Sequence, residues 1–170
     1  MFNNPNMTPT DEAYYEMAKT NYKSWNDALK TKNADNVIVL YENGADLSFL
    51  PAKSPIMIEK VNDGVESKNG NSLEDVKDYF TAFLKKDPDG TVVDEVVMGL
   101  NTYPLNQDGT AYLHSGVYRF KLDSKDDNTI RFSFVWKKAA GGAWKIQHHH
   151  SSYVAKPGLD MPQWVTELGA

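Results

Sequence analysis

The 170-residue sequence contains no cysteine, which excludes disulfide bonds, cysteine–zinc sites and a thiol nucleophile. It has no apolar run near the roughly 20 residues that a membrane-spanning helix needs. The opening segment, MFNNPNMTPT, lacks the basic and apolar regions of a signal peptide. These absences predict a cytoplasmic protein that has no membrane partner.

Phosphate-binding glycine motifs are also missing. Neither G-x-G-x-x-G nor G-x-x-x-x-G-K-[ST] occurs, which argues against dinucleotide and P-loop chemistry, and we expect no cofactor. The 23 acidic residues outnumber the 18 basic ones and give a formal net charge of −5. This balance argues against a nucleic-acid partner.

The composition is that of an ordinary globular chain, with 41% hydrophobic and 24% charged residues. A chain of this length most simply forms one domain, and we expect a single domain over residues 1–170. The polar, proline-broken segment 1–9 predicts a flexible arm, and residues 154–170 predict a C-terminal tail.

Apolar residues recur at three- and four-residue steps in the N-terminal half, which predicts three helices. The first follows a Thr10 cap and ends near Lys32, the second covers Ala34–Glu42, and the third follows a Ser72 cap. A strand is expected at Ala45–Leu50.

The period changes to two in the C-terminal half, where we expect four antiparallel strands: Thr91–Thr102, Ala111–Leu122, Ile130–Lys138 and Ala143–Tyr153. Turns are expected around Asn106–Gly109, Ser124–Asn128 and Gly141–Gly142. Helices followed by an antiparallel sheet indicate an α+β fold. A curved sheet that wraps the helices forms a cone whose mouth is a natural pocket for a small molecule.

Strict alternation divides the last strand into two faces. One face carries Trp144, Ile146, His148 and His150; the other carries Lys145, Gln147, His149 and Ser151. A β-bulge in this strand would exchange the two sets.

Several segments resemble a known family: SWNDALKTKNADNVIVLYENGADLSFLP, VKDYFTAFLKKDPDG, SGVYRF and RFSFVWKKAAGGAWKIQHHHSS. They cover most of residues 24–152. The order of elements resembles the nuclear transport factor 2-like superfamily, the cystatin-like cone fold shared with SnoaL-like polyketide cyclases. Within it, the closing Trp-Lys-Ile-x-His-His-His-Ser-Ser resembles the association domain of calcium/calmodulin-dependent protein kinase II and its stand-alone bacterial relatives.

The resemblance implies a pocket that the kinase domain lines with three arginines. Here the matching positions hold His114, Phe134 and Ser151, which implies a more neutral, aromatic and histidine-bearing pocket. The candidate ligand-pocket residues are therefore His114, Tyr118, Phe134, His149 and Ser151, with Arg131, His148 and His150 as alternates. Tyr41, Tyr79 and Tyr112 offer hydroxyls that could also line the cone, but for each the favoured interpretation is a core tyrosine whose hydroxyl lies at the rim.

The histidines suit acid–base work or hydrogen bonding to a ligand, because imidazole titrates near neutral pH. The alternative is that they pack at the sheet surface or at a dimer interface. The sequence contains no zinc-binding spacing, so we expect no metal site. It also contains no G-x-S-x-G elbow. Ser151 and Ser152 follow the histidines, but neighbours on a strand point to opposite faces, so adjacency does not pair a serine with a histidine base, which argues against a serine hydrolase.

Two functions stay open. In the first, the cone binds a small apolar or mildly acidic organic ligand, with or without acid–base turnover by a histidine, so both an enzyme and a binding protein stay open. In the second, the chain is an association module. In either case we expect a homodimer through the convex sheet face, with Trp136 and Trp144 on the contact surface.

Overall fold

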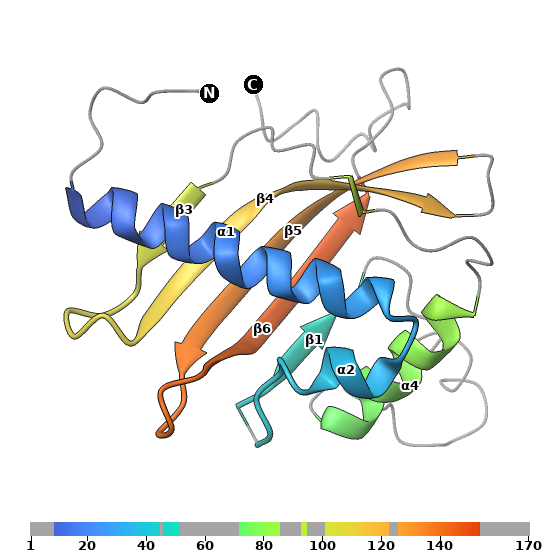
Figure 1. The fold of residues 1–170 in the computed structure, drawn as a ribbon, viewed down its shortest axis with the longest axis horizontal. Coiled ribbons are helices and arrows are strands. Elements are labelled where there is room, and N and C mark those ends of the chain that lie inside the picture. Colours follow the sequence, from blue (N-terminus) through green and yellow to red (C-terminus); the bar gives the residue numbers. More distant parts are fainter. Residues whose placement is uncertain are drawn as a thin grey trace, which may run out of the picture.

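The computed structural model describes residues 9–44, 46–51, 72–85, 93–94, 101–122 and 126–153. These residues form three helices and six strands: α1 (Pro9–Lys30), α2 (Ala34–Ile38), β1 (Ser48–Leu50), α4 (Leu73–Leu84), β2 (Val93–Asp94), β3 (Asn101–Pro104), β4 (Ala111–Leu122), β5 (Asp126–Lys138) and β6 (Trp144–Tyr153). The strands form one sheet in the order β1-β6-β5-β4-β2, and β3 also pairs with β4. Helix α1 crosses the curved sheet, and α2 and α4 lie beside β1 (Figure 1). The α+β cone that the sequence predicted is confirmed.

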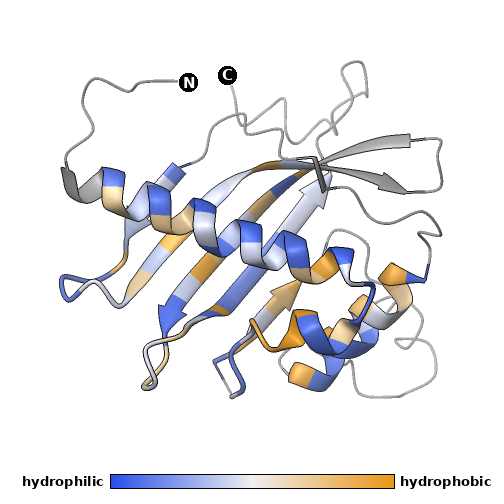
Figure 2. Ribbon diagram, viewed as in Figure 1, coloured by the Kyte–Doolittle hydropathy of each residue, from blue (hydrophilic) through white to orange (hydrophobic). Residues whose placement is uncertain are grey.

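Helix α1 covers the concave face of the sheet with one apolar side. Its buried residues follow the predicted spacing and are Tyr14, Ala18, Tyr22, Trp25 and Leu29. Hydrophobic and hydrophilic residues alternate along its ribbon (Figure 2). The helix starts at Pro9, so the expected Thr10 cap is wrong, because Thr10 is the second helical residue, and the expected 1–9 arm is one residue too long. Proline suits the first turn because its fixed φ is helical and its missing N–H has no intrahelical acceptor there. The rest of the arm and the 154–170 tail lie outside the described residues.

Helices α2 and α4 both begin at side-chain caps. Asn33 accepts a hydrogen bond from the Asp35 amide at the start of α2, and Ser72 accepts one from the Asp75 amide, as predicted. Helix α2 ends at Ile38, so its expected extension to Glu42 is wrong. The chain there joins the sheet instead, since Leu40 accepts from the Ile146 amide and the Glu42 amide donates back to Ile146.

The first expected strand of the C-terminal half, Thr91–Thr102, lies within the described residues only at 93–94 and 101–102, and both of these parts are strands. Strands β2 and β3 both pair with β4, but Asp94 lies opposite Arg119 whereas Asn101 lies opposite Ser115. The two registers on β4 therefore differ. Strand β4 has the expected bounds, while β5 begins at Asp126, inside the segment expected to be a turn.

Two glycines hold the turns of this sheet in conformations that other residues rarely adopt. Gly109 has a φ of 72° and Gly142 a φ of 84°. A Cβ on Gly109 would also lie 3.3 Å from the Tyr14 hydroxyl, because α1 packs closely over this turn. The predicted turns at both sites are confirmed.

A β-bulge at Gln147 decides which side chains of β6 face the helices. Val135 pairs with His148 but the next residue, Trp136, pairs with Ile146, so Gln147 is the extra residue. Ile146 and His149 are consequently both buried, and the expected strict alternation is wrong at this point. The segment that pairs with the edge of β6 away from β5 changes at the same place. Tyr41 lies opposite Ile146, and β1 lies opposite the three histidines.

Aromatic side chains on the inner face of the sheet pack against the helices. Trp136 is 1% exposed and belongs to this core, with its ring 5.9 Å from that of Phe134. Trp144 packs on Tyr112 at 5.0 Å, and the Tyr112 hydroxyl accepts a hydrogen bond from Asn21 of α1. The expectation that Trp136 and Trp144 form an outer contact surface is therefore wrong, because both lie on the inner face.

Candidate functional site

A row of four side chains crosses the inner face of the sheet and places two histidines on either side of one phenylalanine. His114 of β4 lies opposite Phe134 of β5, Phe134 opposite His149 of β6, and His149 opposite Phe49 of β1. Directly opposed residues share a face of a sheet. All four are buried, and the two imidazoles flank the Phe134 ring, with centroids 6.2 Å and 4.4 Å from it.

The imidazole of His149 is held by one hydrogen bond and by packed rings. Its Nδ1 lies 2.8 Å from the Tyr41 hydroxyl, which also accepts a bond from Trp25 Nε1 at 3.1 Å. The rings of Trp25 and Phe49 lie 5.7 Å and 5.2 Å away. These contacts fix the orientation of the imidazole plane.

The second nitrogen of His149, Nε2, is buried and has no hydrogen-bond partner among the residues that the structure describes. Burial lowers the pKa of His149 well below its usual value, and the neighbouring His148 and His150 lower it further. The imidazole is therefore neutral at physiological pH.

His114 is enclosed even more completely. Neither ring nitrogen has a partner within the described part of the chain, and the side chain is fully buried. The rings of Phe132 and Tyr22 lie 5.0 Å and 5.9 Å away. Burial lowers the pKa of His114 to about 4, so this imidazole is neutral too.

Tyr118 and Ser151 lie farther along the same face. Ser151 is opposite Phe132, whose ring stacks on that of Tyr118 at 5.0 Å. Burial raises the pKa of Tyr118, and a hydrogen bond with Ser151 acts against this rise. The sheet thus places all five first-choice candidates, His114, Tyr118, Phe134, His149 and Ser151, on the buried inner face.

The three alternates lie on the opposite face. The side chain of Arg131 is exposed and donates to the Tyr153 carbonyl at 3.4 Å. His150 is exposed and His148 is half-buried; burial lowers the pKa of His148, and His150 adds to the effect. The structure therefore separates Arg131, His148 and His150 from the row of buried residues.

Sequence reasoning missed the contact that orients His149. It named Tyr41 only among several tyrosines, and it gave Trp25 no role beyond the apolar side of α1. The pairing of Tyr41 with Ile146 brings the tyrosine to this site across the sheet. No local pattern signals such a long-range pairing.

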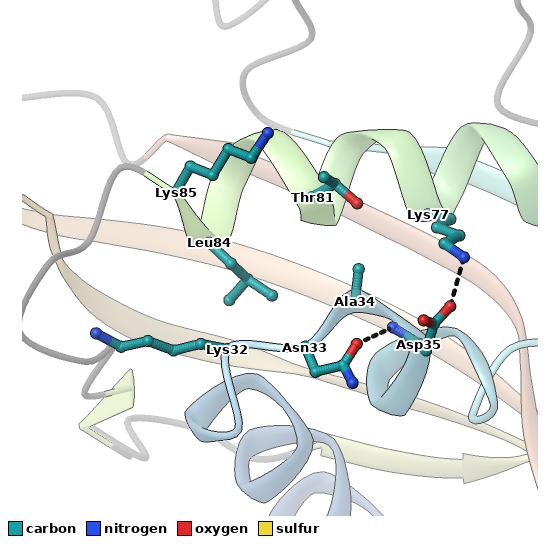
Figure 3. Close-up of a pocket in the computed structure, with 8 residues that line it drawn as sticks. All are labelled: Lys32, Asn33, Ala34, Asp35, Lys77, Thr81, Leu84 and Lys85. Atoms are coloured by element: carbon teal, nitrogen blue, oxygen red, sulfur yellow. Dashed lines mark hydrogen bonds and ion pairs between the residues drawn. The ribbon is translucent and has the colours of Figure 1, made fainter.

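The other features that bear on function lie outside the cone. A hollow of about 260 Å³ between α2 and α4 is lined by Lys32, Asn33, Ala34, Asp35, Lys77, Thr81, Leu84 and Lys85 (Figure 3). Lys77 and Asp35 form an ion pair across it at 2.5 Å. None of the candidate site residues lines this hollow.

Within the described ranges no three His, Asp or Glu side chains are placed to hold a metal ion, and no helix is long and apolar enough to cross a membrane.

No family model matches the sequence, and no curated protein does. Among solved structures, the chain is similar to a Xanthomonas campestris protein assigned as a calcium/calmodulin-dependent protein kinase II association domain. The two share 30% identity and a TM-score of 0.58, over 81% of this chain and 84% of the other.

Two further matches share the fold at lower identity. A nuclear transport factor 2-like protein of unknown function from Pseudomonas putida KT2440 has a TM-score of 0.62 and 13% identity, over 92% of this chain and 99% of the other. A Streptomyces avermitilis protein, assigned as a dehydratase of the same family, has a TM-score of 0.61 and 14% identity. The match covers 88% of this chain and 100% of the other. The resemblance that the sequence predicted is confirmed.

Proposed function

This chain belongs to the calcium/calmodulin-dependent protein kinase II association-domain family, within the nuclear transport factor 2-like superfamily, and we propose that it binds a small organic ligand inside the cone. The polar contact to the ligand is His149. Its neighbours across the sheet, Phe134 and Phe49, supply apolar walls.

The observation that carries this proposal is the unpaired Nε2 of His149. A buried polar group without a partner costs about 1–3 kcal/mol. His149 is nevertheless 3% exposed, and its other nitrogen is fixed by Tyr41. An oriented imidazole with one unused nitrogen has the features of a ligand contact, because a ligand atom at that nitrogen removes the cost.

The sequence departs from the arginine-lined pocket of the kinase domain in a way that supports the same proposal. The resemblance implies that His114, Phe134 and Ser151 match the three arginine positions, and all three lie on the buried inner face. The described lining is therefore aromatic and uncharged. Such a lining suits a ligand that is largely apolar.

A thermal-shift screen of small aromatic and alicyclic compounds tests the proposal on three proteins. Wild type and His150→Leu should be stabilised by the same compounds, and His149→Leu should lose that response. His150 is the matched control because it is the next residue and lies exposed on the outer face. If no compound stabilises wild type, or if His149→Leu responds as wild type does, the proposal fails.

A second function, self-association, is favoured by the outer face of the sheet. Leu113, Val117 and Val135 lie half-buried there, and Tyr103, opposite Leu113, is 56% exposed. The described aromatic contacts of the helices reach inner-face residues instead, as those of Trp25 with Phe134 and of Tyr22 with Phe132 show. An apolar strip of this kind fits a second copy of the sheet, so we propose a homodimer, which is compatible with a ligand in the cone.

A further inference from the structure

We propose that Tyr41 locks His149 in the tautomer that carries its proton on Nε2, so that the cone takes an uncharged ligand with a carbonyl-type acceptor on a flat apolar body. This inference rests on the proposed function and narrows it to one class of ligand. Tyr41 acts as a positioning residue, since it touches His149 and not the ligand.

Counting protons in the buried network determines the tautomer. Indole nitrogen only donates, so the Trp25 Nε1–H bond at 3.1 Å uses the Tyr41 oxygen as an acceptor. The single hydroxyl proton of Tyr41 then has His149 Nδ1, at 2.8 Å, as its acceptor. If Nδ1 carried a proton instead, it would donate to the same oxygen, and the Tyr41 proton would lose this acceptor.

Burial disfavours the arrangement in which Nδ1 carries the proton. Tyr41 is 2% exposed, and a buried donor without an acceptor costs about 1–3 kcal/mol. Nδ1 is therefore the unprotonated nitrogen. A neutral imidazole holds its one proton on the other nitrogen, so Nε2–H is a donor that needs an acceptor.

The surroundings of His149 keep the donor neutral. The described rings packed against it are those of Trp25, Tyr41, Phe49 and Phe134, and none of these residues carries a charge at neutral pH. Its titratable neighbours in β6, His148 and His150, lie on the outer face and disfavour a second proton on His149. Of the cations of the adjacent strand, Arg131 lies on the outer face, and Lys137 and Lys138 are exposed at the end of the strand.

An anionic ligand would consequently lose its hydration without gaining a counter-charge, which is strongly unfavourable. A ketone, amide or ester oxygen accepts one hydrogen bond and brings no charge. The aromatic rings around His149 favour a flat apolar body over a branched polar one. The ligand class that follows is an uncharged carbonyl compound, not the mildly acidic one that the sequence left open.

Three probes that share a ring system test the class: 2-acetylnaphthalene, naphthalene and 2-naphthoate, titrated at pH 7.5 and followed by tryptophan fluorescence. The ketone should bind about tenfold more tightly than the hydrocarbon, as one hydrogen bond implies. Naphthoate should bind more weakly than the ketone. The advantage of the ketone should vanish in His149→Leu and persist in His150→Leu.

The tautomer itself is measured without any ligand. Proteins labelled with ¹⁵N-histidine should show His149 with a protonated Nε2 and an unprotonated Nδ1, and Tyr41→Phe should lose this preference. A protonated Nδ1 in wild type overturns the inference. Two binding results also overturn the inference: naphthoate binds more tightly than the ketone, or the ketone binds no better than naphthalene. If His149→Leu abolishes binding in either case, the proposed function survives. If none of the three probes binds, the proposed function fails for this ligand type and the inference fails with it.

Discussion

The Tyr41 hydroxyl lies 2.8 Å from Nδ1 of His149, although the two residues are 108 positions apart in the sequence. A parallel bridge between Tyr41 and Ile146 brings them together, and the bulge at Gln147 then turns His149 to the same inner face. The hydrogen bond therefore depends on two irregular features of the sheet. Both lie within three residues of the histidine.

Replacing Tyr41 by phenylalanine should destabilise the protein by roughly 2–4 kcal/mol. The change leaves Trp25 Nε1 and His149 Nδ1 buried without their shared partner, and each unsatisfied group is costly. Urea unfolding measures the loss. Tyr103→Phe removes the same hydroxyl from an exposed position and should stay within about 0.5 kcal/mol of wild type. Equal effects of the two substitutions would show that the buried network contributes nothing.

His114 should make the protein less stable as the pH falls below about 6.5. Its pKa is about 4 in the folded state, against 6.5 for an unperturbed imidazole, so the unfolded state binds the extra proton between these values. The free energy of unfolding then decreases by up to about 1.4 kcal/mol per pH unit in that window, and the loss levels off below pH 4. The lowered pKa of His149 acts in the same direction.

The substitution His114→Leu isolates this effect, because it removes the titrating group and keeps a side chain of similar size. Urea unfolding should show that the free energy of unfolding falls between pH 7.5 and pH 5 by about 2 kcal/mol less in the variant than in wild type. An unchanged pH dependence would mean that His114 is protonated as easily in the folded protein as in the unfolded one.

The outer sheet face should mediate dimerisation. Light scattering at micromolar concentration should give twice the mass of the chain, and Val135→Lys should give a monomer with an unchanged circular dichroism spectrum. Val135 is half-buried at the centre of the outer face, opposite Leu113 and His148, so a charge there opposes contact with a second sheet. Thr20→Lys adds the same charge to an exposed position of α1 and should remain dimeric. A monomeric wild type would remove the self-association proposal.

The cap of α4 offers a local test of the fold. Ser72→Ala removes the acceptor of the Asp75 amide and should cost about 1 kcal/mol in unfolding free energy. Ser72→Asp keeps an acceptor at that position and should recover most of the loss. If the two variants are equally unstable, the side-chain bond does not contribute to the stability of α4.

Periodicity predicted the parts of this structure that local chemistry determines. The apolar side of α1, the Ser72 cap, the bounds of β4 and the turns at Gly109 and Gly142 all follow from residues close together in the sequence. The alternation of Phe132, Phe134 and Trp136 with Ser133 and Val135 likewise separates the two faces of β5, and the face with the large rings is the buried one.

The predictions that were wrong concern features that depend on pairing between distant segments of the sequence. Nothing in the segment Ala34–Glu42 signals that Leu40 and Glu42 bond to Ile146, which ends α2 at Ile38. The different registers of β2 and β3 on β4 and the bulge at Gln147 are features of pairing between strands. Burial of Trp136 follows from the same pairing, since alternation separates two faces but does not say which one the helices cover.

A crystal structure determined at pH 7.5, after soaking with 2-acetylnaphthalene, tests the central claim most directly. We predict density for the probe inside the cone, with its carbonyl oxygen within hydrogen-bond distance of His149 Nε2 and its rings against Phe134. If the cone is filled only by the protein's own side chains, and the probe binds elsewhere or not at all, His149 is a packed core residue and the account of a ligand site is wrong.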